Sequence, residues 1–175
     1  MESLTTNLTI SLADFLKILS LIFTAFTVLL ARKSLIENTQ WNRNQFASQL
    51  LANWSEQTLK HREAIESYKP GIIDFLDQND LQHALSEEEA EAIYSSRPHQ
   101  KQLWNLRFHI TQILNYFELI ASAYHNNIAD PKIVDHSFIP AMQHYHKVLG
   151  NFIKVVEKHR GFNPWEPYTH LIIKS

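Results

Sequence analysis

Two histidines separated by a single residue, His144 and His146, come closest to a metal-binding pattern in this sequence. Imidazole nitrogens are common zinc ligands, and two of them on one helix share a face only when their positions differ by three or four. At 3.6 residues per turn, a difference of two directs these side chains about 200° apart. Four further histidines are scattered and form no His-Glu-x-x-His pattern: His83, His99, His109 and His125. We therefore expect no metal site and predict that the histidines are solvated or cap helix ends.

A cluster of carboxylates, Glu87 to Glu89 with Glu91, is the second pattern with chemical potential. Paired carboxylates can serve as general acid and base. They can also hold two metal ions when Glu-x-x-His repeats face each other across a helical bundle, and this sequence has no such repeat. Acidic residues are also favourable at the positive end of a helix dipole. Ser86 and Glu89 have the spacing of a capping box, so we predict that the cluster stabilises the start of a helix.

Asn115 and Glu118 are polar residues within a strongly apolar stretch. Because they are three positions apart, both can face the same neighbouring helix. We predict that they form a polar clamp that fixes the register of two helices, with Arg107 or Arg62 as the partner of Glu118. A ligand-binding role for Asn115 and Glu118 is the alternative.

The remaining composition offers no catalytic constellation. The chain has 175 residues, no cysteine and three glycines, and it contains neither a phosphate-binding loop nor a nucleophile elbow. We therefore predict no catalytic residue, no cofactor and no enzymatic activity. The net charge of −2, from 16 basic and 18 acidic residues, gives no basic face, so nucleic acid is not an expected partner.

The first element of the chain is an apolar run, Ile18 to Ala31, that ends directly at Arg32 and Lys33. A membrane-spanning helix needs roughly 17 to 25 apolar residues. Extending the run back to Phe15 gives a helix of about 26 Å at 1.5 Å per residue. We therefore predict a transmembrane anchor, with some tilt or local thinning of the bilayer.

Basic residues decide the orientation of this anchor, because Lys and Arg concentrate on the cytoplasmic side of a span. Arg32, Lys33 and Arg43 follow the run, whereas Lys17 alone lies near its other end. We predict that the N-terminus lies outside and the rest of the chain in the cytoplasm, which agrees with the absence of cysteine. The predicted boundaries are 1–10 for an extracytoplasmic tail, 11–33 for the anchor, capped by Ser11, and 34–175 for a cytoplasmic helical domain.

Two alternatives to an anchor remain open. A cleaved signal peptide carries basic residues before its apolar core, and Glu2 is the only charge before Asp14 here. A core helix of a soluble domain is the other alternative. Leu, Ile, Phe and Val cover every face between Ile18 and Leu30, which a surface helix of a small domain does not show.

Helical patterns continue through the rest of the chain, and no segment alternates with period two for long enough to form a strand. No Pro or Gly occurs before Pro70, so one helix can run from the anchor to Tyr68. One continuous helix is the simplest prediction for this range, and a break in the polar stretch from Asn38 to Asn44 is the alternative. Further helices are predicted at 86–95, 100–126, from Asp130-Pro131, at 138–160 before Gly161, and after Asn163.

This pattern predicts an all-α fold, in which a single N-terminal transmembrane helix continues into a cytoplasmic antiparallel helical bundle. Trp54, Trp104 and Trp165 are expected in the core or in contacts between helices. Trp41 follows Lys33 by about two turns, so it can lie near the lipid headgroups or pack against another helix. We favour packing for Trp41.

Two stretches of this sequence resemble a known family. Phe46-Ala-Ser-Gln-Leu-Leu-Ala-Asn-Trp54 follows the anchor and precedes Arg62. Leu114-Asn-Tyr-Phe-Glu-Leu-Ile-Ala121 precedes Asn127-Ile-Ala-Asp130, and Asn163-Pro164-Trp165 stands near the end. Together they resemble the bacterial family named domain of unknown function 4760, whose members look like short membrane-anchored helical proteins. The resemblance implies an architecture and carries no activity.

The functional hypothesis is a non-catalytic, single-pass protein of the bacterial inner membrane. We expect an accessory or scaffold subunit that contacts membrane lipid and binds a membrane-protein partner or a second copy of itself. Ser20, Thr24 and Thr27 lie on one face of the anchor, and small residues of this kind pack membrane helices together. The alternative is a membrane-linked signalling or phage-defence effector that acts as a homo-oligomer. For an enzyme of unknown class, no set of residues qualifies.

Overall fold

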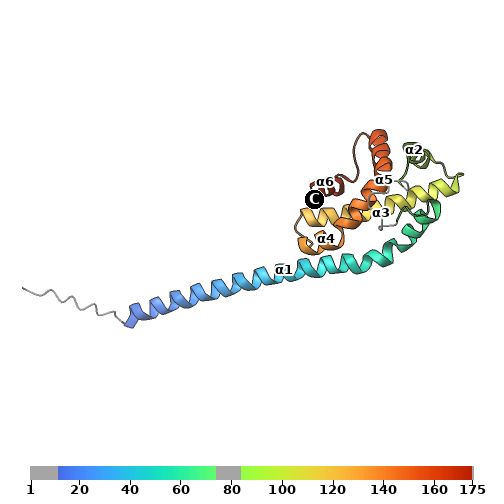
Figure 1. Ribbon diagram of the computed structural model, residues 1–175. Coiled ribbons are helices and arrows are strands. Elements are labelled where there is room, and N and C mark those ends of the chain that lie inside the picture. Colours follow the sequence, from blue (N-terminus) through green and yellow to red (C-terminus); the bar gives the residue numbers. More distant parts are fainter. Residues whose placement is uncertain (1–11, 74–83, 175) are drawn as a thin grey trace, which may run out of the picture. The chain divides into compact units, whose positions relative to one another are not determined.

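The computed structural model describes the backbone of residues 12–73 and 84–174 and, in the first helix, side chains from residue 15 onward. All regular structure in these ranges is α-helix (Figure 1), which confirms the predicted all-α fold. The predicted tail, 1–10, and residues Ser11 and His83 lie outside the described residues. The helices are α1 (Leu12–Tyr68), α2 (Glu87–Ser95), α3 (Lys101–His125), α4 (Pro131–Ser137), α5 (Ile139–Arg160) and α6 (Glu166–Lys174).

The chain divides into two compact units, Met1–Trp41 and Asn42–Ser175, called here the first and second units. Helix α1 contributes to both units. It contains neither Pro nor Gly, and it remains helical from Asn38 to Asn44. The prediction of one continuous helix through this stretch is therefore confirmed.

Local signals set the ends of α1 and α2. Helix α1 ends at Tyr68, ahead of Pro70, and Gly71 turns the chain with a φ of 88°, which favours glycine. The Ser86 hydroxyl accepts the backbone N–H of Glu89 at 3.1 Å, and the Glu89 carboxylate accepts the backbone N–H of Ser86 at 2.7 Å. The predicted capping box at the start of α2 is confirmed.

The ends of α4 and α5 also follow the predicted signals. The Asp130 carboxylate accepts the backbone N–H groups of Lys132 and Ile133, and Pro131 occupies the first helical position of α4. Helix α5 ends at Arg160, and the residue that caps it, Gly161, has a left-handed φ of 76°. Both boundaries agree with the sequence analysis.

An aromatic cluster fills the centre of the second unit. Phe117 of α3 is fully buried and stacks on Trp54 of α1, with ring centroids 5.1 Å apart, and on Tyr168 of α6 at 5.4 Å. Trp54 meets Phe138 and Tyr145 edge-on, each at 6.4 Å. Side chains from α1, α3, α5 and α6 thus meet in one core, where aromatic pairs add to the stabilisation from buried apolar area.

Contacts between α1 and α3 fix their relative direction within the second unit. The Tyr116 hydroxyl donates to the Leu50 carbonyl at 2.6 Å, and the Nδ1 atoms of His61 and His109 are 2.8 Å apart. Residue numbers rise along α1 as they fall along α3, so this pair is antiparallel, as the bundle prediction requires.

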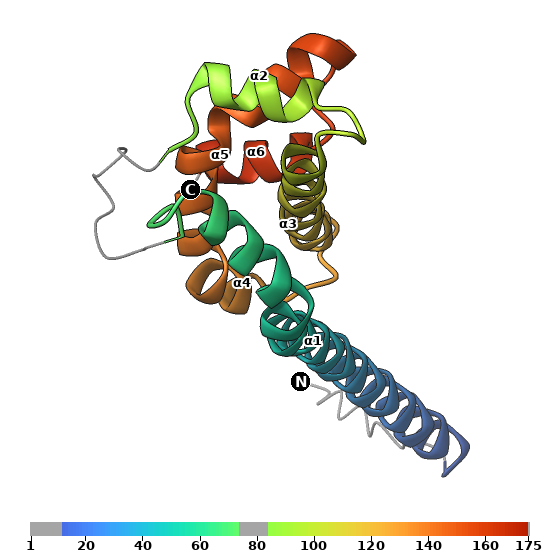
Figure 2. The ribbon, with the colours of Figure 1, turned by 90° about the vertical axis from the view of Figure 1, so that its right-hand side faces the viewer.

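Helix α2 is not part of an antiparallel pair with α5. The Leu85 N–H donates to the Val148 carbonyl at 2.9 Å, and the Glu91 carboxylate lies 2.6 Å from Nε2 of His159. Residue numbers therefore rise in the same direction along both segments, so α2 runs parallel to the second half of α5. Helix α2 also contacts α3 and runs across it in Figure 2. Parallel and crossing helices therefore accompany the antiparallel pair.

Two of the four tryptophans differ from expectation. Trp41, predicted to pack against another helix, is 66 % exposed, because the described part of the first unit contains no second helix. Trp104 is 40 % exposed, and one of its neighbours is the guanidinium of Arg107, 5.5 Å from the ring centroid. The packing predicted for Trp54 and Trp165 is confirmed, since Trp54 joins the aromatic cluster and Trp165 is only 3 % exposed.

Candidate functional site

The first candidate site is the apolar segment of α1 within the first unit. Every large apolar side chain from Phe15 to Leu30 is exposed, with exposed fractions between 47 % and 71 %. Burial of apolar surface stabilises by about 25 cal/mol per Å², so exposure of this whole circumference to water is unfavourable. The segment therefore needs apolar surroundings, either lipid or protein.

Two hydroxyl groups inside this segment find partners within the helix. The hydroxyl of Thr24 donates to the Ser20 carbonyl, and that of Thr27 to the Phe23 carbonyl, each at 2.8 Å. Such internal bonds suit hydrocarbon, which offers no water to unpaired donors. Among the described residues, α1 is the one helix long and apolar enough to cross a membrane. An 18-residue window of it has a mean hydropathy of 1.9 and no buried residue.

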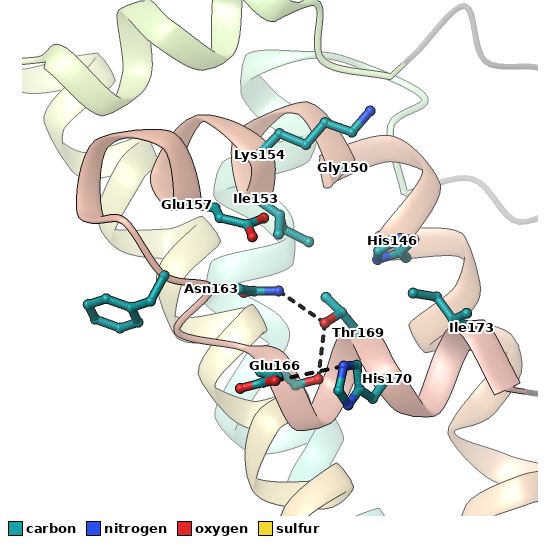
Figure 3. A pocket seen from close by; sticks show the side chains of 11 residues that line it. His146, Gly150, Ile153, Lys154, Glu157, Asn163, Glu166, Thr169, His170 and Ile173 are labelled. Carbon is teal, nitrogen blue, oxygen red and sulfur yellow. Dashed lines mark hydrogen bonds and ion pairs between the residues drawn. The ribbon is translucent and has the colours of Figure 1, made fainter.

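The second candidate site is a cavity of about 520 Å³ between α5 and α6 in the second unit (Figure 3). Gly150, in the middle of α5, lines it. A Cβ on Gly150 would meet no atom within 4 Å, and its φ is not positive, so neither packing nor backbone geometry requires glycine. A glycine inside a helix costs about 1 kcal/mol relative to alanine. Packing within the chain does not offset that cost.

Polar side chains at the base of the cavity hold the turn between α5 and α6. The Asn163 side chain accepts the Trp165 N–H at 2.9 Å and donates to the Thr169 hydroxyl at 3.0 Å. Thr169 in turn donates to the Glu166 carbonyl at 3.0 Å. Asn163 bonds the N–H of Trp165, the residue directly before α6, so it holds the turn ahead of the helix, and these groups are committed to the fold.

The two histidines of α5 have separate surroundings and do not converge. His144 is 9 % exposed, and its Nε2 donates to the Ile72 carbonyl at 3.0 Å. The prediction of a solvated or capping histidine is therefore wrong for His144. Its side chain can be buried because the carbonyl of Ile72, in the turn after α1, accepts the imidazole N–H. His146 lines the α5–α6 cavity beside Tyr168, and burial, followed by the charge of Lys154, lowers its pKa.

Sequence spacing gives no sign of a further histidine pair, His61 of α1 and His109 of α3, which are 48 positions apart. Their Nδ1 atoms are 2.8 Å apart, so one neutral ring donates to the other. Burial lowers the pKa of both imidazoles. The partner His109 and then Lys60 lower the pKa of His61 further, and Lys60 also lowers that of His109. In residues 15–73 and 84–174, no three His, Asp or Glu side chains gather as a possible metal site.

We expect the free energy of unfolding to fall as the pH drops below about 6.5, partly because of this histidine pair. A folded-state pKa below the ordinary value of about 6.5 means that the unfolded chain binds more protons in this range. The stabilisation is therefore present above pH 6.5 and is lost as the pH falls towards the lowered values. Urea unfolding between pH 7.5 and 5 measures it.

A double variant, His61→Asn with His109→Asn, should flatten this pH dependence. His99→Asn is the matched control, because His99 is exposed and its loss should leave the slope unchanged. Equal slopes for the wild type and the double variant would contradict the assignment.

Asn115 and Glu118 of α3 act together on one neighbouring segment, as predicted. The Asn115 side-chain oxygen accepts the indole N–H of Trp165 at 2.9 Å, and the Glu118 carboxylate accepts the backbone N–H of Tyr168 at 3.1 Å. Burial raises the pKa of Glu118, while the bond from Tyr168 opposes that rise. The two residues therefore hold the start of α6 against α3.

The arginine partners predicted for Glu118 were wrong. Arg107 donates to the Tyr94 carbonyl at 2.7 Å, and the guanidinium of Arg62 lies 5.4 Å from the centroid of the Trp54 ring. A backbone N–H in the first turn of α6 takes their place, since such groups have no partner within their own helix.

Replacement of Glu118 by alanine is expected to lower the free energy of unfolding by about 1–3 kcal/mol, because it leaves the Tyr168 N–H without its acceptor. Thermal unfolding followed by circular dichroism measures this effect. Glu63→Ala, at an exposed position of α1, is the control. An unchanged melting temperature together with lost biological activity would instead favour ligand binding by Glu118.

The glutamates near the start of α2 make structural contacts. The Glu89 carboxylate lies 2.8 Å from Nζ of Lys69, besides its role in the capping box. Glu91 pairs with His159, whose ring stacks on Tyr94 at a centroid distance of 4.6 Å. The capping bond of Glu89 agrees with the predicted role of the cluster at the helix start, whereas the pairs with Lys69 and His159 join α2 to the end of α1 and to α5.

Comparison with known proteins identifies the family. The model of the family described as Domain of unknown function (DUF4760) matches residues 15–175. The chain belongs to the DUF4760 family. No curated protein and no solved structure matches the chain. The DUF4760 match starts at Phe15, the first apolar residue whose side chain the structure describes, so the apolar segment and the helical unit both belong to the family pattern.

Proposed function

We propose that this DUF4760 protein is a single-pass protein of the bacterial inner membrane. Its helical second unit would act in the cytoplasm as a non-catalytic accessory or scaffold subunit for another membrane protein. The observation that carries this proposal is that every large apolar side chain from Phe15 to Leu30 is exposed. Lipid removes that surface from water with no rearrangement of the second unit.

Basic residues support the proposed orientation. Arg32 and Lys33 directly follow the apolar segment, and Arg43 comes later in α1. Lys17 is the one basic residue near the other end of the segment. Under the positive-inside rule, this difference favours a cytoplasmic second unit.

Reporter fusions test this topology. Green fluorescent protein fused after Ser175 should fluoresce, whereas alkaline phosphatase at the same position should be inactive, because it folds only in the oxidising periplasm. The same two reporters fused ahead of Met1 should give the opposite results. An active phosphatase after Ser175 would overturn the orientation, and extraction of the chain by alkaline carbonate would overturn the anchor itself.

Small residues on one face of the apolar segment support helix packing inside the membrane. Ser20, Thr24, Thr27 and Ala31 are spaced by four, three and four, so they lie along one stripe of α1. The threonine hydroxyls are bound to their own helix, which leaves a shallow surface that a second helix can approach closely.

Purification in mild detergent tests whether this stripe binds a partner. The wild type should co-purify with one membrane protein in fixed stoichiometry, and a Ser20→Leu, Thr24→Leu, Thr27→Leu variant should lose it. A control with Ile22→Leu and Leu29→Ile changes the opposite face and should retain the partner. A homo-oligomer without another protein would instead support the alternative, a signalling or phage-defence effector. If the triple leucine variant retained the partner, the stripe would be excluded as the binding surface.

A further inference from the structure

The α5–α6 cavity has features of a ligand site that the proposed function does not use. Its volume of about 520 Å³ lies within the range of small-molecule sites, about 300–1,000 Å³. Gly150 keeps one wall free of a side chain although packing within the chain does not require glycine there. Room beside a helix backbone is a common reason for glycine where another molecule approaches closely.

Two carboxylates that line this cavity, those of Glu157 and Glu166, carry negative charge and have few partners, while the cation of Lys154 and the imidazole of His146 also line it. In the described part of the chain, no hydrogen bond or ion pair engages the Glu157 carboxylate, and Glu166 has only His170 at 3.8 Å. Figure 3 shows the ammonium of Lys154 turned away from Glu157. The amide of Asn163 is already committed to the turn. A ligand that donates hydrogen bonds and carries positive charge is therefore favoured.

Apolar side chains complete the cavity. Ile153 lines the α5 wall, and Ile173 lines the α6 wall with 75 % of its surface exposed. Phe162 at the turn is 59 % exposed, and an aromatic face attracts cations. A ligand in which an aliphatic chain adjoins a positively charged nitrogen matches these apolar and aromatic side chains.

We propose that this cavity binds a primary alkyl-ammonium ion through the carboxylates of Glu157 and Glu166. The aliphatic chain of the ligand lies along Ile153 and Ile173, in the room beside Gly150. Two sources share this chemistry: a free polyamine, and the side chain of a lysine on a partner protein.

Titration calorimetry on the full chain in detergent micelles, at 150 mM salt, tests the proposal with spermidine as the probe. Saturable binding to one site is expected. A Glu157→Gln, Glu166→Gln variant should bind at least tenfold more weakly. The matched control is Glu56→Gln with Glu63→Gln, which removes the same charge from exposed positions of α1 and should bind as the wild type does. Equal weakening by both double variants would indicate general charge attraction and overturn the site.

A third variant tests the room beside Gly150. Gly150→Leu fills the cavity with a good helix former, so it should abolish binding without lowering the melting temperature. Spermidine binding that survives this change, or the absence of saturable binding to the wild type, would overturn the proposal.

Two further probes separate the ligand sources. N-acetyl-lysine methylamide that binds as tightly as spermidine indicates a partner lysine, and much tighter spermidine binding indicates a free polyamine. Both results support the site. Glutarate, an anion with a similar aliphatic chain, should not bind, and glutarate binding tighter than that of spermidine would overturn the assigned charge. These measurements need no membrane partner, so their failure is separate from a failure of the proposed function.

Discussion

A chain that carries Phe23→Arg and Phe26→Arg is expected to leave the membrane. Both phenylalanines lie near the middle of the apolar segment, with 71 % and 58 % of their surface exposed. An arginine at the centre of a transmembrane helix costs about 2.5–3.5 kcal/mol, so two of them oppose insertion by about 5–7 kcal/mol. Arginine is a good helix former, so α1 itself should persist. Alkaline carbonate extraction followed by immunoblotting measures the released fraction.

The control for this experiment places the same charges outside the predicted span. Leu35 and Ile36 are also exposed, but they follow Arg32 and Lys33. Leu35→Arg with Ile36→Arg should remain in the membrane fraction, because these positions are expected to face water or headgroups. Release of both variants to the same extent would mean that the chain is held by overall hydrophobicity and not by a defined span.

Replacement of Phe117 by alanine is expected to produce the largest loss of stability in the second unit. Phe117 is fully buried and stacks on Trp54 and Tyr168, so the change removes aromatic contacts and leaves a cavity at the centre of the core. Such substitutions cost about 3–5 kcal/mol, a large share of the roughly 5–15 kcal/mol that stabilises a typical domain. Urea unfolding followed by tryptophan fluorescence measures the change.

Leu119→Ala is the matched control, because Leu119 lies on the same helix with 49 % of its surface exposed. It should cost less than about 1 kcal/mol, since exposed substitutions away from special contacts have small effects. A loss for Phe117→Ala no larger than that for Leu119→Ala would contradict the aromatic cluster as the centre of the core.

Local chemistry explains why the helix boundaries could be predicted from sequence. The capping box of Ser86, the cap of Asp130 and the left-handed turn at Gly161 each depend on residues within a few positions of one another. These signals determine where helices begin and end, and they carry little information about which helices meet.

Long-range partners could not be predicted in the same way. The spacing of Asn115 and Glu118 shows that they share a face, but the N–H that Glu118 binds is 50 positions away, at Tyr168. His61 and His109 became neighbours only because α1 and α3 pack antiparallel. A salt bridge with arginine was the natural sequence-based expectation for Glu118. The exposed N-terminus of a short helix offered an alternative donor that no local pattern reveals.

The candidate ligand site was also beyond the reach of sequence reasoning. Gly150 looks like an ordinary small residue until the structure places open space next to it. Trp41 illustrates the opposite error, because an aromatic residue in a polar stretch suggests packing, whereas 66 % of its surface is exposed. Both cases depend on what surrounds a position and not on its neighbours along the chain.

Tyr116 and Tyr168 each donate a phenolic hydrogen to a main-chain oxygen, that of Leu50 and that of Met142. Every residue type supplies such an oxygen, so the replacement of Leu50 or Met142 by another apolar residue preserves the hydrogen bond. A change from tyrosine to phenylalanine removes the bond at once. Purifying selection should therefore retain both tyrosines across distant homologues, while the identities of the accepting residues diverge.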